Sequence, residues 1–139
     1  MKKNLLILTL LALFTSCSDD ATIIKNDKAL SNLPCMNLVV FPPDKLITQT
    51  LLKLYNFDTN CRYRLEVSRK SGIVCNSNQN ADKKALTNFP SGYIRMDLYK
   101  NGTSLYSYYK DLTHKASQDD IYDAFKRLQK DLLKVRKKI

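Results

Sequence analysis

The sequence contains little glycine and histidine, and no apolar run long enough to stay in a membrane as a helix. The 139 residues include three glycines, so there is no glycine-rich loop of the kind that cradles phosphates. The one histidine, His114, lies in a polar stretch far from every cysteine, and the cysteine spacings do not match a zinc site. We therefore expect no catalytic residues, no metal and no cofactor, and hence a protein that is not an enzyme.

Residues 1–16 have the plan of a secretory signal peptide. Lys2 and Lys3 supply a positive start, the run from Leu5 to Phe14 is apolar except for Thr9, and small residues follow. The apolar run is too short for a lasting transmembrane helix, which needs about 20 residues. We expect the segment to be removed on export.

The end of this segment, Phe14-Thr15-Ser16-Cys17, resembles the lipobox of bacterial lipoproteins. The resemblance covers residues 1–20, with Phe14 standing where the family prefers Leu. It implies that Cys17 is the lipidation site and becomes the first residue of the mature protein. Acyl chains such as palmitate then form the membrane anchor, and two or more chains anchor stably where one does not.

The residues after the cysteine carry a sorting pattern. Ser18 is similar to the outer-membrane class of lipoproteins, and Cys17-Ser18-Asp19-Asp20 also resembles the acidic surface-export signal of some Bacteroidota. Both likenesses imply a lipid-anchored protein of the cell envelope at the outer membrane, on the periplasmic or the surface side.

The chain is basic, with a formal net charge of +10 that the loss of Lys2 and Lys3 lowers by two. A basic surface favours anionic partners such as nucleic acid, lipopolysaccharide phosphates or glycan polymers, or it is simply a solvated surface. Export makes nucleic acid the least expected of these, so we predict no nucleic-acid partner.

Three cysteines remain once Cys17 is assigned to lipid. An oxidising compartment favours a disulfide, and an odd number leaves one thiol over. We expect one pair among Cys35, Cys61 and Cys75, and the sequence does not decide which.

Residues 17–33 are polar and mixed, so we expect the lipidated Cys17 and a flexible tether there, followed by a single domain at 34–139. Within the domain, 35–41 predicts a short buried strand between prolines. The pattern then predicts a helix at 44–56, capped by Asp44, and an alternating strand at 61–68. A short strand at 73–75 and a short helix at 81–86 complete this half.

The clearest local pattern is the hairpin of strands 93–100 and 103–110. Asn101-Gly102 is the residue pair of a type I′ turn. A regular two-residue loop places Leu98 opposite Leu105 and Met96 opposite Ser107 on the buried face. The other face then holds Tyr93, Arg95, Asp97 and Tyr99 opposite Lys110, Tyr108, Tyr106 and Ser104.

Ser117 opens a final helix in a capping-box pattern with Asp120. One apolar stripe follows, and it consists of Ile121, Phe125, Leu128, Leu132 and Val135. The whole pattern predicts the α+β class: a two-layer sandwich with an antiparallel sheet of 4–5 strands and two helices on one face.

Two helices on one face leave the other sheet face open, and this is the candidate site. Its residues can stack on sugars and hold phosphates, they can dock a protein, or they can be ordinary solvated cross-strand pairs. The candidates for a ligand or partner are Arg62, Arg64, Tyr93, Arg95, Tyr99, Tyr106, Tyr108 and Lys110.

The order of elements and the anchor are similar to small outer-membrane assembly lipoproteins, in architecture only. We therefore predict a non-enzymatic, lipid-anchored envelope lipoprotein that is structural or an accessory subunit of an outer-membrane assembly, with an envelope protein as partner. The alternative is a module that binds anionic glycolipid or glycan through the open face.

Overall fold

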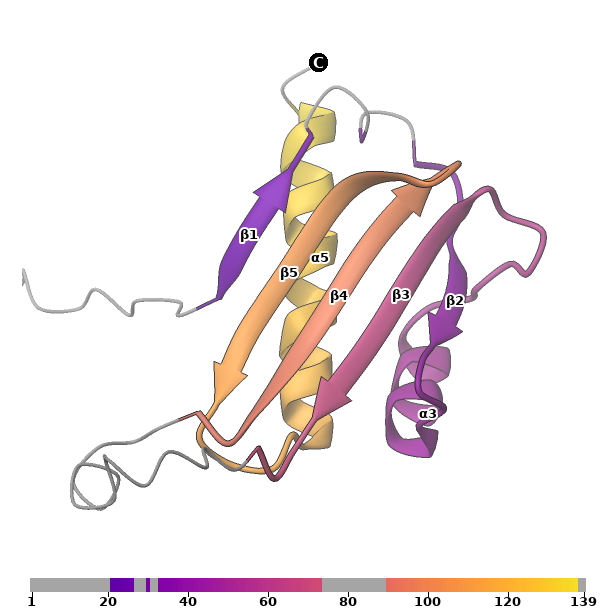
Figure 1. Ribbon diagram of the computed structural model, residues 1–139. Coiled ribbons are helices and arrows are strands. Elements are labelled where there is room, and N and C mark those ends of the chain that lie inside the picture. The colour runs from indigo at the N-terminus through magenta and orange to yellow at the C-terminus, as the bar shows by residue number, and fades with distance from the viewer. Residues whose placement is uncertain (1–20, 27–29, 31–32, 74–89, 138–139) are drawn as a thin grey trace, which may run out of the picture.

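The computed structural model describes residues 21–26, 30, 33–73 and 90–137. In this part of the chain, five strands form one sheet and two helices pack on it (Figure 1). The strands are β1 (Thr22–Lys25), β2 (Asn37–Val40), β3 (Tyr63–Lys70), β4 (Gly92–Lys100) and β5 (Thr103–Leu112), and the helices are α3 (Lys45–Leu54) and α5 (Gln118–Lys137).

The strand order is β1-β5-β4-β3-β2, and the predicted two-layer α+β class is confirmed. Figure 1 shows α5 running behind β4 and β5, with α3 beside it. The sheet is mixed rather than antiparallel throughout, because β2 and β3 pair in parallel. The chain leaves β2, passes through α3 and returns in the same direction, as a crossover connection between adjacent parallel strands requires.

Both helices begin where the sequence predicts. The Asp44 carboxylate accepts a hydrogen bond from the Ile47 backbone N–H at 3.1 Å. At α5, Ser117 and Asp120 form the reciprocal capping box: the Ser117 N–H donates to the Asp120 carboxylate at 2.8 Å, and the Asp120 N–H donates to Ser117 Oγ at 3.3 Å. Each cap satisfies N–H groups that a helix start leaves without partners.

The core lies between the sheet and the two helices. The predicted stripe of α5 is buried as far as Leu132, the last residue of the stripe whose side chain is described. Phe125 from this stripe contacts the rings of Tyr55 and Phe57, which follow α3, with centroids 6.1 and 6.0 Å away. The two helices therefore share one apolar layer on one face of the sheet.

The hairpin register differs from the prediction because β5 contains a bulge. Lys100 pairs with Thr103 and Tyr99 with Ser104, but Leu98 then pairs with Tyr106, so Leu105 is the extra residue. One extra residue exchanges the two faces for the rest of β5. Tyr106 and Tyr108 are therefore buried against the helices, where Tyr106 Oη donates to the buried Asp131 carboxylate on α5 at 3.0 Å.

The expected tether is also corrected, because part of it belongs to the sheet. Thr22–Lys25 forms β1, which pairs antiparallel with β5, and Leu30 and Leu33 are buried in the core. The described domain therefore extends to residue 21 rather than starting at residue 34. Adding β1 pairs the backbone groups along the edge of β5 and covers apolar surface with Ile23.

One disulfide joins Cys35 and Cys61, which lie just before the paired strands β2 and β3. This decides the pairing that the sequence left open. Cys75 lies outside the described residues, as does the predicted helix at 81–86. Of the predicted strand at 73–75, only Ile73 is described, and it is not in a strand.

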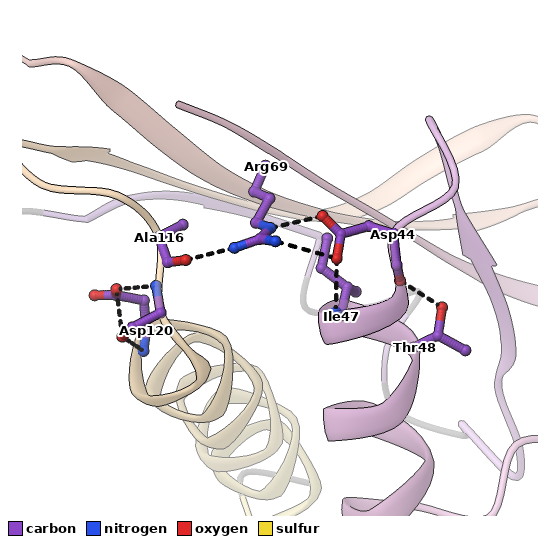
Figure 2. Close-up of polar contacts among 7 residues, drawn as sticks. Asp44, Ile47, Thr48, Arg69, Ala116 and Asp120 are labelled. Atoms are coloured by element: carbon purple, nitrogen blue, oxygen red, sulfur yellow. Dashed lines mark hydrogen bonds and ion pairs between the residues drawn. The ribbon is translucent and has the colours of Figure 1, made fainter. Parts of the chain in front are cut away.

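Arg69 on β3 ties the starts of both helices to the sheet (Figure 2). Its guanidinium donates to the Asp44 carboxylate at 2.6 Å and to the Ala116 carbonyl, just before α5, at 2.5 Å. Burial raises the pKa of Asp44, but hydrogen bonds from Arg69 and Ile47 outweigh it, and the net pKa lies below its ordinary value. Both helices are thereby held on one side of the sheet, and no helix of the described residues covers the opposite face.

Candidate interaction surface on the open sheet face

The open face is the side of the sheet opposite α3 and α5. Side chains alternate along a strand, and paired residues share a face, so its members follow from the register. They are Thr22 and Ile24 on β1; Ser104, Ser107, Tyr109 and Asp111 on β5; Tyr93, Arg95, Asp97 and Tyr99 on β4; Arg64, Glu66, Ser68 and Lys70 on β3; and Asn37 and Val39 on β2, with Phe41 next in the chain.

Half of the residues predicted for this face lie on it. The register brings together Arg64, Tyr93, Arg95 and Tyr99 from two adjacent strands. Arg62 is exposed but precedes β3, so it lies at the margin of the face.

Three residues that were predicted to lie on the open face do not lie on it. Tyr106 and Tyr108 lie on the helix side, opposite Leu98 and Met96, and both are buried. Lys110 is opposite the core residue Ile94 and therefore belongs to the helix side as well. All three follow Leu105, so the bulge alone accounts for the error.

The bulge places Ser107 and Tyr109 on the open face instead. Tyr93 and Tyr109 stack with ring centroids 5.4 Å apart. Tyr109 Oη donates to the Asp111 carboxylate at 2.9 Å, and this hydrogen bond is the main reason that the pKa of Tyr109 is raised. Alternation in the sequence could not have identified either residue, because nothing local marks Leu105 as the extra one.

The arginines of the open face are already paired with carboxylates. Arg95 Nε lies 2.5 Å from Asp97 Oδ2, and Arg64 Nη2 lies 2.8 Å from Glu66 Oε1. The hydrogen bond that Arg95 donates to Asp97 is the main reason that the pKa of Arg95 is raised. The face carries three carboxylates, those of Glu66, Asp97 and Asp111, and three cations, those of Arg64, Arg95 and Lys70, so it is not the strongly basic surface that the net charge suggested.

Asp97 is the buried polar centre of this face. Its side chain is 8% exposed and accepts hydrogen bonds from Arg95 and from Ser107 Oγ, the latter at 2.6 Å. Its neighbour across the ladder is Glu66, a like charge. Like charges directly opposite are unfavourable, and the adjacent Arg64 and Arg95 offset this repulsion.

Beside this polar centre lies a hollow of about 210 Å³. Phe41 borders it and is 76% exposed, although the sequence predicted it in a buried strand. Ile24 lies on the same face, on the strand at the opposite edge of the sheet, and its side chain is 69% exposed. Exposed tyrosine, arginine and large apolar side chains on one surface are typical of protein interfaces. The hollow is lined by Phe41, Glu66, Val67, Ser68, Arg95, Asp97 and Tyr99.

The described residues contain no cluster of three metal-binding side chains, and His114 instead lies 3.0 Å from the Asp120 carboxylate. Neither of the helices in the described ranges is long and apolar enough to cross a membrane.

Comparison of the chain with models of protein families, with curated proteins and with solved structures finds no match.

Proposed function

We propose that this protein is a lipid-anchored, non-enzymatic lipoprotein of the bacterial cell envelope that binds a partner protein through the open face. Its place is the outer membrane, where it acts as a structural or accessory subunit of an assembly. The observation that carries the partner-binding part is the sheet face that no described element covers, with exposed Phe41 and Ile24 around paired charges and tyrosines.

The anchor part is supported by the lipobox-like residues 14–17 and by the disulfide. The Cys35–Cys61 bond fits a protein exported to an oxidising compartment. β1 begins five residues after Cys17. Five residues span at most about 18 Å, so acylation of Cys17 would hold the sheet close to the membrane surface.

The pairing of both arginines on the open face favours a protein over an anionic ligand. Arg64 and Arg95 would have to leave Glu66 and Asp97 in order to bind a phosphate, and the second of these carboxylates is almost fully buried. Removing one member of such a pair leaves a buried charge without its partner, which is costly.

The substitution Cys17→Ser tests the anchor. We expect the wild-type protein to sediment with membranes and to carry acyl chains by mass spectrometry, with residues 1–16 removed. The variant should lack acyl chains and keep its signal segment. Normal processing of the variant would contradict the proposal.

A photo-crosslinking amino acid in place of Tyr99 tests the open face in the native envelope. We expect a crosslink to one envelope protein. The same amino acid in place of Tyr122, which is exposed on α5, is the matched control and should give no such crosslink. Equal crosslinking at both positions, or none at Tyr99, would argue against a partner on this face.

The glycolipid alternative has its own test. If the open face binds lipopolysaccharide, binding should weaken with salt and be lost in the double variant Arg64→Ala with Arg95→Ala. Binding that survives in the double variant excludes this face as the glycolipid site.

A further inference from the structure

The free edge of β2 is the feature that the proposed function does not use. β2 is the last strand of the sheet and pairs only with β3 among the described strands. The Phe41 N–H donates to the Val67 carbonyl at 3.3 Å, so the backbone groups of Phe41 point toward β3. In a parallel pair, the N–H and C=O of one residue point to the same side of the strand, and the side alternates from residue to residue. The N–H and C=O groups of Leu38 and Val40 therefore point away from β3. No described residue pairs with these four groups.

The usable part of this edge is short and well defined. At its N-terminal end, the Asp58 N–H donates to the Met36 carbonyl at 2.9 Å, so this carbonyl already has a partner. At its C-terminal end, Pro42 and Pro43 have no backbone N–H. The free edge is therefore Leu38–Val40, with two donors and two acceptors at strand spacing.

The edge also lacks a charged residue of its own. Edge strands usually carry a charge that prevents pairing with other chains, and β1 at the opposite edge has Lys25. The run from Met36 to Pro43 has no charged residue, in a chain with a net charge of +10. Along the strand itself, two copies of the chain can therefore pair without bringing like charges together.

We propose that a second copy of this chain adds its β2 antiparallel to this edge, about a two-fold axis between the two Val39 residues. Leu38 of each copy then lies opposite Val40 of the other, and each of these two pairs exchanges both of its backbone hydrogen bonds. This register is the one that uses all four free groups. Centring on Leu38 would require the Met36 carbonyl, which Asp58 occupies, and centring on Val40 would require an N–H from Pro42.

The side chains around the edge suit this arrangement. On the helix side, a groove of about 640 Å³ lies between β2 and α3. It is lined by Leu38, Val40, Pro43, Asp44, Lys45, Thr48 and Gln49, so one acid and one base accompany its apolar side chains. The second copy's Leu38 and Val40 would lie over it. On the open face, each exposed Phe41 would lie beside Asn37 of the other copy. The contact is isologous and closes after two copies.

The substitution Val39→Cys tests the pairing in the full chain, in a Cys75→Ser background. The two Val39 positions form a non-hydrogen-bonded pair with Cα atoms about 4.5 Å apart, which is within disulfide reach. Mild oxidation in membranes should give a dimer band on a non-reducing gel. The matched control is Ile24→Cys, at the more exposed opposite edge, which should stay monomeric.

A second change separates backbone pairing from chance contact. Val40→Pro removes an outward N–H, and proline is tolerated on an edge strand when its nitrogen faces solvent. Added to Val39→Cys, it should abolish the dimer band, while an intact Cys35–Cys61 bond and an unchanged circular dichroism spectrum show that the fold persists.

Three results would overturn the proposal. They are no dimer from folded Val39→Cys, equal dimer from Ile24→Cys, and a dimer that survives Val40→Pro. A crosslink of Val39→Cys to a different protein would assign the edge to a foreign strand instead. The dimer should also form in a Cys17→Ser background, so failure of the anchor and failure of the pairing can be told apart.

Discussion

Tyr106 and Tyr108 are the residues at which the sheet and α5 are coupled. Both side chains are buried, and the Tyr106 hydroxyl is held by Asp131, which in turn accepts from Arg127 Nε at 3.2 Å. Burial, followed by the nearby Asp123 and Asp120 charges, raises the pKa of Tyr108 to about 12. Burial and the Asp131 charge raise the pKa of Tyr106 as well. The fold therefore holds both phenols in the neutral form.

This coupling predicts a loss of stability at alkaline pH. In the unfolded chain a tyrosine ionises near pH 10, below the pKa of about 12 for Tyr108 in the fold. The contribution of Tyr108 to the free energy of unfolding is complete below pH 10 and is lost as the pH rises through 12, because the tyrosine of the unfolded chain releases its proton first. The free energy of unfolding should fall by roughly 1.4 kcal/mol per pH unit for each buried tyrosine.

Urea unfolding at several pH values from about 9 to about 12 measures this slope, because the tyrosine pKa values lie in this range. Tyr108→Phe should make the slope shallower, since one of the two groups no longer titrates. Tyr122→Phe, at an exposed position, should leave it unchanged. An equal slope in wild type and Tyr108→Phe would show that Tyr108 does not supply it.

At the scale of the elements, Arg69 decides how the helices sit on the sheet. Arg69 lies on β3 and contacts Asp44, the N-cap of α3, and the carbonyl of Ala116, two residues before α5 (Figure 2). Its side chain is 17% exposed, so most of the interaction is shielded from water. One residue thus holds two helix starts on the same side of the sheet.

Arg69→Ala should lower the free energy of unfolding by roughly 2 kcal/mol, because it removes charge-assisted hydrogen bonds and leaves Asp44 without its cation. Arg64→Ala is the control, because its ion pair is half exposed, and its effect should stay below about 1 kcal/mol. Urea denaturation of both variants makes the comparison. Equal effects would mean that the Arg69 contacts add nothing beyond an ordinary surface pair.

At the scale of the whole molecule, the disulfide and β1 tie down the two ends of the sheet. Cys35–Cys61 joins the starts of β2 and β3 around the α3 crossover, and β1 covers the far side of β5. A modest core is thereby supplemented by a covalent link, as is common in small exported domains.

Replacing both Cys35 and Cys61 by serine should lower the free energy of unfolding by about 3.5 kcal/mol, from the loop entropy of a 26-residue separation. Reduction of the wild-type protein should produce the same change in a urea titration. A reduced wild type as stable as the oxidised protein would contradict this prediction.

The candidate site was half predictable. Arg64, Tyr93, Arg95 and Tyr99 follow from alternation on two strands, because period two is a local property of the backbone. Tyr106, Tyr108 and Lys110 did not follow, because the bulge at Leu105 exchanges the faces of β5. The bulge is favoured by what the exchange buries, Tyr106 and Tyr108 against α5 in place of Ser107 and Tyr109, and that depends on a helix distant in sequence.

The sequence by itself determined the features that arise within a few neighbouring residues. These are the helix caps at Asp44 and Ser117, the Asn101-Gly102 turn, the alternation of β3 and the two-layer α+β class. The tertiary structure alone decided the pairing of Cys35 with Cys61, the addition of β1 to the sheet and the register of β5. Each of these depends on contacts between distant segments, whose free energy is set only when the core is packed.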